Sequence, residues 1–139
     1  MTTTTRILST AVACLCAAAI TGAQSGQAAI EAETIQHFQA LLRIDTSSPP
    51  GNETRAVEYL KQVFDKEGIP YEIFAKDKSR ANLVARLKGN GKKRPILIMG
   101  PTDVVTVDPA KWTHPPFGAA RDGGYIYGRG TVDDKDNLV

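Results

Sequence analysis

The sequence predicts an α/β fold in which two amphipathic helices precede a series of short strands. Apolar residues recur at helical spacing over residues 31–43 and again over residues 53–64, the pattern of helices that bury one face. Alternating or continuous apolar runs follow at residues 71–75, 82–87 and 95–99, as expected of strands. Helices followed by strands of both kinds indicate helices packed on a mixed sheet.

The chain of 139 residues is long enough for one modest domain. Apolar residues make up 42% and charged residues 23% of it, which argues against both a disordered chain and a membrane bundle. The net charge of +2 is too small to predict a nucleic-acid partner. The basic cluster at residues 92–94 has no aromatic residue beside it, so we interpret it as a solvated turn.

The N-terminal segment predicts export. Arg6 precedes an apolar stretch over residues 7–20, and small residues then offer cleavage sites near Ala23 or Ala29, the order found in secretory signal peptides. We therefore expect a signal peptide over residues 1–29 and a periplasmic or secreted mature part over residues 30–139.

Two other interpretations of this segment are weaker. A membrane anchor needs roughly 20 strongly apolar residues, and this stretch is shorter and diluted by Ser, Thr and Ala, so no stable anchor is expected. A lipoprotein attached at Cys14 would prefer a leucine where Ala11 stands. Cys14 and Cys16 are the chain's two cysteines, so the mature part is expected to have no disulfide and no thiolate ligand.

The helices have recognisable ends. The first is expected over residues 31–43, followed by a turn-rich loop over residues 45–51. Asn52 is expected to cap the second helix, and Gly68 to end it. His37 lies on the first helix, where a lone histidine is more often a surface or packing residue than a ligand, so we assign it no site role.

The pattern of apolar residues predicts different degrees of burial for the three strands. Residues 71–75 and 82–87 alternate like half-exposed strands, and Gly89-Asn90-Gly91 suits a hairpin connection to the next strand. Residues 95–99 are continuously apolar, as in a strand buried on both faces. Ligands in α/β sheets collect beyond the carboxyl ends of strands, which makes residues 100–103 the expected site.

The run over residues 96–135 carries the most specific pattern of the chain. Asp103 comes just past the third predicted strand, and Asp133 with Asp134 follows a short strand that leaves the turn at residues 122–124. Carboxylates held at the edge of a rigid sheet are typical of metal sites.

This run closely resembles the co-catalytic zinc exopeptidases and aminoacylases, a family that includes glutamate carboxypeptidase, carnosinase, acetylornithine deacetylase and succinyl-diaminopimelate desuccinylase. The residues that match in order and spacing are Gly100, Asp103, Val104, Val105, Trp112, Pro116, Phe117, Asp122, Gly123, Gly128, Arg129, Gly130, Asp133, Asp134 and Lys135. A less specific likeness reaches back through residues 80–87 and 48–53 to about Glu31. The resemblance implies part of a three-layer α/β/α catalytic domain with a mixed sheet, here without the family's lid domain.

The resemblance also implies roles for individual residues. Asp133 is expected to bridge two Zn²⁺ ions and to be joined to Asp134 by a cis peptide. Asp103 is expected to be the catalytic-site carboxylate that orients a ligand histidine two residues earlier. Pro101 occupies that histidine's position, and proline has no side-chain atom that could replace the nitrogen.

The implied activity is that of an exported zinc-dependent exopeptidase or amidohydrolase that acts on peptides or N-acyl amino acids. Two zinc ions would polarise the amide carbonyl and lower the pKa of a shared water. We expect the chain to be inactive as given, because Pro101 replaces one ligand and the family's other ligands would follow Val139. A homodimer through the lid domain is compatible with the resemblance.

Other interpretations remain open. The loss of the imidazole favours a non-catalytic remnant or binding module of the same fold. Taken without the motif, Asp133 and Asp134 read as a helix cap with Lys135 as a surface partner. A calcium loop is disfavoured because residues 133–137 lack the alternating ligands, central glycine and closing glutamate.

The loop over residues 112–117 contains a second histidine, His114. The family has no ligand in this loop, so we do not assign His114 to a metal. Trp112 and Phe117 are expected to pack the loop over the sheet edge. Arg129, between two glycines, is expected to anchor the loop rather than contact substrate.

Overall fold

The computed structural model describes residues 26–139, and the boundary between two compact units falls between Gln36 and His37. Most of the predicted signal peptide lies outside the described residues, and its last part, residues 26–29, is helical. Within the described part of the chain, no helix combines the length and apolar character needed to cross a membrane.

The first helix covers residues 26–42, so the helix predicted over residues 31–43 is confirmed and begins earlier than expected. The second, α2, spans Glu53–Glu67. Gly68 ends α2 in the left-handed conformation with φ 66°, and the N–H of Ile69 donates to the carbonyl of Phe64 over 2.8 Å. This is the glycine-dependent helix end that the sequence predicts.

Asn52 occupies the N-cap position of α2, but its side chain makes no capping hydrogen bond, contrary to the prediction. The start of the helix is held from another segment. The N–H of Thr54 donates to the carbonyl of Ser79 over 3.0 Å, and its Oγ1 donates to the carbonyl of Lys78 over 2.7 Å. Backbone carbonyls of a segment remote in the sequence therefore accept a hydrogen bond at the start of the helix that a capping side chain would otherwise accept.

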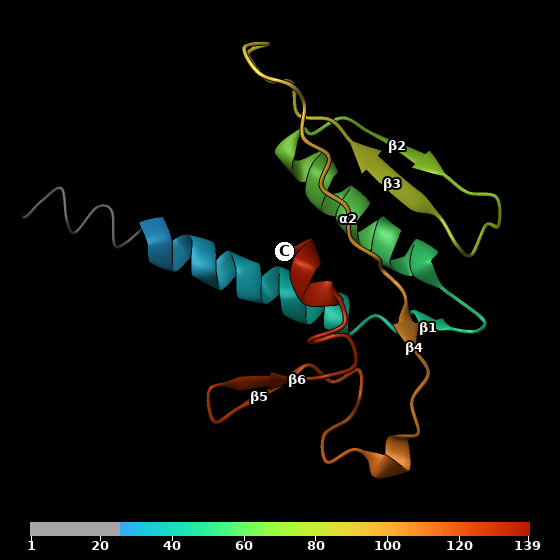
Figure 1. The fold of residues 1–139 in the computed structure, drawn as a ribbon. Coiled ribbons are helices and arrows are strands. Elements are labelled where there is room, and N and C mark those ends of the chain that lie inside the picture. The colour runs from blue at the N-terminus through green and yellow to red at the C-terminus, as the bar shows by residue number, and fades with distance from the viewer. Residues whose placement is uncertain (1–25) are drawn as a thin grey trace, which may run out of the picture. The chain divides into compact units, whose positions relative to one another are not determined.

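The hairpin after α2 confirms two predicted strands. Strand β2 (Tyr71–Phe74) pairs antiparallel with β3 (Asn82–Ala85), with Tyr71 opposite Ala85 and Phe74 opposite Asn82. Figure 1 shows the hairpin beside α2, which β3 contacts directly.

The prediction of a third strand over residues 95–99 is wrong. These residues have no regular secondary structure, and Ile96 and Met99 are 83% and 79% exposed. An apolar run becomes a buried strand only when neighbouring strands take its backbone hydrogen bonds, and no strand among residues 26–139 pairs with it. The expected hairpin at Gly89-Asn90-Gly91 is absent for the same reason; there the side chain of Asn90 accepts the N–H of Lys92 over 3.1 Å.

Two shorter pairs complete the sheets. Strand β1 (Ser47–Ser48) pairs parallel with β4 (Val104–Val105). Strands β5 (Ala120–Asp122) and β6 (Tyr125–Tyr127) pair antiparallel. Helices with both parallel and antiparallel pairs confirm the α/β class.

The tight turn between β5 and β6 is formed by Gly123 and Gly124, which both have positive φ, 56° and 85°. Two successive residues in this region make the turn that matches the twist of a hairpin. The short strand predicted to leave residues 122–124 is thereby confirmed.

The core of the described residues is small and includes three polar side chains. Its buried members are Leu41, Leu42, Thr46, Glu53, Ala56, Val57, Ala81, Val104, Ala119 and Lys135.

Candidate functional site

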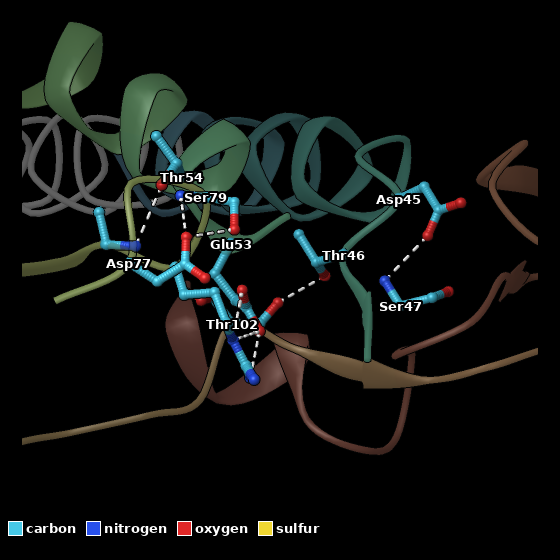
Figure 2. Close-up of polar contacts among 10 residues, drawn as sticks. Asp45, Thr46, Ser47, Glu53, Thr54, Asp77, Ser79 and Thr102 are labelled. Carbon is cyan, nitrogen blue, oxygen red and sulfur yellow. Dashed lines mark hydrogen bonds and ion pairs between the residues drawn. The ribbon is translucent and has the colours of Figure 1, made fainter. Parts of the chain in front are cut away.

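The segment that carries Asp103 is held on both sides by Thr46. The hydroxyl of Thr46 donates to the carbonyl of Thr102 over 2.6 Å, and the N–H of Val104 donates to the carbonyl of Thr46 over 3.2 Å (Figure 2). Thr46 is fully buried, whereas Asp103 is exposed. The parallel pairing of β1 and β4 thus fixes the backbone around a carboxylate that faces solvent.

Asp133 lies in a turn closed by backbone hydrogen bonds. The N–H of Lys135 donates to the carbonyl of Gly130 over 2.9 Å, and Gly130 has φ 92°, a conformation that glycine adopts without strain. The peptide between Asp133 and Asp134 is cis, as the family resemblance implies. Asp133 is exposed, and Asp134 is half-buried and accepts a hydrogen bond from the Asn137 side chain.

The two carboxylate-bearing segments pack directly on each other. A methyl group built on Gly130 would lie 3.0 Å from Cγ1 of Val104. One built on Gly100 would lie 2.8 Å from Cδ2 of Leu138 in the 3₁₀ helix η2 (Lys135–Leu138). A side chain at either glycine would force the neighbouring Val104 or Leu138 side chain to shift. Residues 100–104 and 130–138 are therefore neighbours, although their roles in a site stay a prediction.

Lys135 is buried, which overturns its alternative interpretation as a surface partner of Asp133 and Asp134. Its ammonium donates to the carbonyls of Leu41 and Ile44 over 2.9 and 2.7 Å. Burial lowers the pKa of Lys135 to about 8, a shift that the charge of Asp45 partly opposes. Asp134 stands at the N-cap position of η2 without a side-chain capping bond, so the simple cap interpretation is also wrong.

An ion pair between the partly exposed Arg80 and the buried Glu53 lies close to Asp103. The guanidinium of Arg80 donates to both carboxylate oxygens of Glu53. The pKa of Arg80 is raised, first by the hydrogen bond to Glu53, then by the charge of Glu53, and to a smaller degree by the charge of Asp103. No sequence pattern pointed to this pair, although both residues fall in the segments of weaker family likeness.

Arg80, Pro101 and Asp103 line a groove of about 930 Å³. Its other walls come from the apolar face of α2, from β3, from residues 97–99 and from the end of η2. The groove therefore combines apolar walls with two acidic side chains, Glu53 and Asp103, and one basic side chain, Arg80, a mixture of the kind found in small-molecule pockets.

The residues present do not fit a two-zinc centre. Among residues 26–139, no three His, Cys, Asp or Glu side chains are grouped closely enough to hold a metal ion. Asp103 and Asp133 offer oxygen donors, but Pro101, which is exposed, offers none.

The two histidines have partners of their own. Nδ1 of His37 lies 2.6 Å from the hydroxyl of Tyr59. The ring of His114 lies 4.2 Å, centroid to centroid, from that of Tyr127. Both therefore contribute to packing in this part of the chain.

Arg129 anchors its loop, as expected. Its guanidinium carbon lies 5.1 Å from the ring centroid of Trp112, within the range of a cation–π interaction. The backbone N–H of Arg129 donates to the carbonyl of Pro116 over 2.6 Å.

The chain is similar to several succinyl-diaminopimelate desuccinylases. No family model matches the chain. It is 40% identical over 111 residues to a probable succinyl-diaminopimelate desuccinylase of Staphylococcus aureus strain Mu50, covering 78% of this chain and 26% of that protein. It is 41% identical over 114 residues to the succinyl-diaminopimelate desuccinylase of Hydrogenovibrio crunogenus, covering 77% and 28%. A probable desuccinylase of Staphylococcus epidermidis is 36% identical over 111 residues, covering 78% and 26%.

The chain spans about a quarter of the length of the curated relatives it matches. The matched part makes up most of this chain. The residues of the motif over 96–135 match, in order and spacing, the motif of the family that the sequence resembles. The chain belongs to the hydrolase family of metallopeptidases and aminoacylases that includes succinyl-diaminopimelate desuccinylase.

Proposed function

We propose that this chain forms part of the catalytic domain of an exported zinc-dependent amidohydrolase that cleaves N-acyl amino acids or peptides. The main support is the direct packing of the segment that carries Asp103 against the segment that carries Asp133, through Val104 and Gly130. The relatives' names specify a succinylated diamino acid, so N-succinyl amino acids are the first substrates to test.

The two carboxylates have different roles in this proposal. Asp133 would hold a metal ion through its exposed carboxylate, together with further ligands that residues 26–139 do not supply. Asp103 is the residue that would orient an imidazole at position 101. With Pro101 in that position, Asp103 has no imidazole to orient, so we expect this form to be nearly inactive.

The test is a pair of chimeras. The matched segment of the Staphylococcus aureus desuccinylase is replaced by this chain's segment, either with Pro101 or with Pro101→His. The histidine form should bind two zinc ions and hydrolyse N-succinyl-diaminopimelate, and a chelator should abolish the reaction. The proline form should be slower by roughly a thousandfold or more, since removing one member of a catalytic unit has effects of that size.

A matched control is Pro70→His, which changes another exposed proline and should restore nothing. Equal turnover by the Pro101 and Pro101→His chimeras, or two tightly bound zinc ions in both, would refute the assignment of position 101.

A second candidate is a binding module without catalysis, which Pro101 favours. Such a module would bind N-succinyl amino acids with unchanged affinity after chelation, as measured by calorimetry. The catalytic proposal instead expects chelation to remove binding, because the metal would contact the substrate.

Export is the remaining part of the proposal, supported by Arg6 and the apolar stretch over residues 7–20. Expressed in a bacterial host, the chain should appear in the periplasm with its N-terminus near residue 24 or residue 30. N-terminal sequencing of periplasmic material that still starts at Met1 would contradict it.

A further inference from the structure

Asn90 and Gly91 lie within residues 86–103, the longest stretch of the described residues without regular secondary structure. All of residues 86–99 are exposed, and no strand among residues 26–139 pairs with them. A methyl group built on Gly91 would meet no atom within 4 Å beyond its chain neighbours. The peptide bond between Asn90 and Gly91 is therefore open to water, and no ladder of backbone hydrogen bonds restrains it.

Asn90 is the one asparagine of the chain that precedes a glycine; the others are Asn52, Asn82 and Asn137. In an asparagine–glycine pair the glycine nitrogen can attack the carbon of the preceding side-chain amide and close a succinimide ring. A side chain on the second residue obstructs this approach, and glycine has none. The sequence thus supplies the least hindered nucleophile, and the structure leaves it uncovered.

A hydrogen bond prepares the side chain of Asn90 for this attack. The N–H of Lys92 donates to Oδ1 of Asn90 over 3.1 Å, which folds the side-chain amide back toward the backbone of Gly91, the residue in between. Oδ1 is the atom that gains negative charge when the amide carbon is attacked, and a donor already in place stabilises that charge. Residues 86–94 also carry five cations and no carboxylate, which favours loss of the Gly91 N–H proton.

We propose that Asn90 deamidates spontaneously in the folded chain, because residues 86–103 leave it unrestrained. The Gly91 nitrogen gives its proton to solvent and forms a bond to Cγ of Asn90. The bond from Cγ to Nδ2 then breaks, and Nδ2 takes up a solvent proton and leaves as ammonia. Water opens the succinimide at either carbonyl, adding OH to the carbon and H to the nitrogen, so that position 90 becomes aspartate or isoaspartate.

Both products change the charge of this stretch. Each places a carboxylate among the five cations of residues 86–94, so each event takes one unit from the chain's net charge of +2. The isoaspartate product also routes the backbone through the former side chain, which adds a methylene between positions 90 and 91. An ageing sample of the chain should therefore separate on ion exchange into forms of lower positive charge.

The test compares the full chain with a synthetic peptide of residues 86–95 at slightly alkaline pH. Peptide mass spectrometry locates the conversion, and methylation by a protein isoaspartate methyltransferase measures isoaspartate. Asn90 in the folded chain should convert at a rate within about twofold of the peptide's rate, or faster. The other three asparagines should convert roughly tenfold more slowly or less, and Gly91→Ala should slow Asn90 by about tenfold, because a methyl group hinders the attack.

Asp122→Asn is the matched control for the surrounding structure. It places a second asparagine before a glycine, Gly123, in the hairpin where residue 122 pairs with Tyr125. Position 122 should convert about tenfold more slowly than position 90 in the folded chain, and at the same rate in denaturant, because the paired strands restrain it.

Two results would overturn the inference. One is conversion of Asn90 that is about tenfold or more slower in the folded chain than in the peptide. The other is equal conversion at positions 90 and 122 of the folded Asp122→Asn chain. The comparison with the peptide uses the unmodified chain, so it decides the matter even where Asp122→Asn does not fold.

Discussion

Arg80 holds Glu53 through two nitrogens of its guanidinium group: Nη2 lies 2.7 Å from Oε1, and Nε lies 3.1 Å from each carboxylate oxygen. The Glu53 side chain is 8% exposed and that of Arg80 is 45% exposed. The pair joins the first turn of α2 to the segment that leads into β3. It also forms one wall of the groove at Asp103.

Arg80→Ala should destabilise the start of α2, because it leaves the carboxylate of Glu53 buried and unpaired. The loss should be smaller than for a fully buried pair, because Arg80 is partly in water. Amide hydrogen exchange in α2 and β3 measures this loss without requiring cooperative unfolding. Arg86→Ala removes an exposed arginine and should have little effect. Adding Glu53→Gln to Arg80→Ala should recover part of the loss, and a failure to do so would contradict the explanation.

Gly51→Ala should disturb the same ion pair, because the added methyl group would contact both of its members. A methyl group at Gly51 would lie 2.8 Å from Nε of Arg80 and 2.9 Å from Oε2 of Glu53, and Gly51 has φ 90°. The strained conformation alone costs about 1–3 kcal/mol for a residue other than glycine. Gly91→Ala is the matched control, since Gly91 has φ 75° and no neighbouring atom within 4 Å of the added methyl group. The NMR signal of the Arg80 Nε–H should shift in Gly51→Ala and stay in place in Gly91→Ala.

The apolar run over residues 96–99 should make the chain self-associate and bind hydrophobic dyes, because its side chains are 78–83% exposed and its backbone is an open edge. For the same reason, residues 30–139 alone should lack a sharp thermal transition. Leu97→Lys should reduce both dye fluorescence and the apparent mass in light scattering. Leu87→Lys changes a residue of similar exposure outside the run and should do less. A monomeric chain with a cooperative transition would show that the run is covered in solution.

Asp77 should make stability depend on acidic pH. Its carboxylate accepts the N–H and the hydroxyl of Ser79, each over 2.8 Å, and these bonds, the backbone one first, lower the pKa of Asp77 from its ordinary value. The unfolded chain therefore binds the proton more readily, so this contribution is present above the unfolded pKa and is lost as the pH falls through the folded one. Asp77→Asn keeps an oxygen acceptor but does not titrate. The stability difference between the two chains, measured by hydrogen exchange in β3, should narrow as the pH falls through the lowered pKa of Asp77, and a constant difference would contradict this.

Local sequence patterns determined most of the secondary structure. The helical spacing over residues 53–64 and the glycine at 68 predicted α2 and its end, and the pair of glycines at 123 and 124 predicted the turn between β5 and β6. These features depend on side chains and backbone conformations within a few residues of each other, which a sequence displays directly. The motif over residues 96–135 likewise identified Asp103, Pro101 and Asp133 as the positions to compare with known metal sites.

Only the tertiary structure decided burial and pairing between distant segments. Residues 95–99 read as a buried strand, yet they are exposed because a strand needs partners that its own residues do not supply. Taken without the motif, Lys135 read as a surface partner of Asp133 and Asp134, yet its ammonium is buried and donates to a carbonyl 94 residues away. Arg80 and Glu53, 27 residues apart, gave no sign of their ion pair. The free energy of a charge or an apolar side chain depends on what surrounds it in space, and that environment is built from residues that are remote in the sequence.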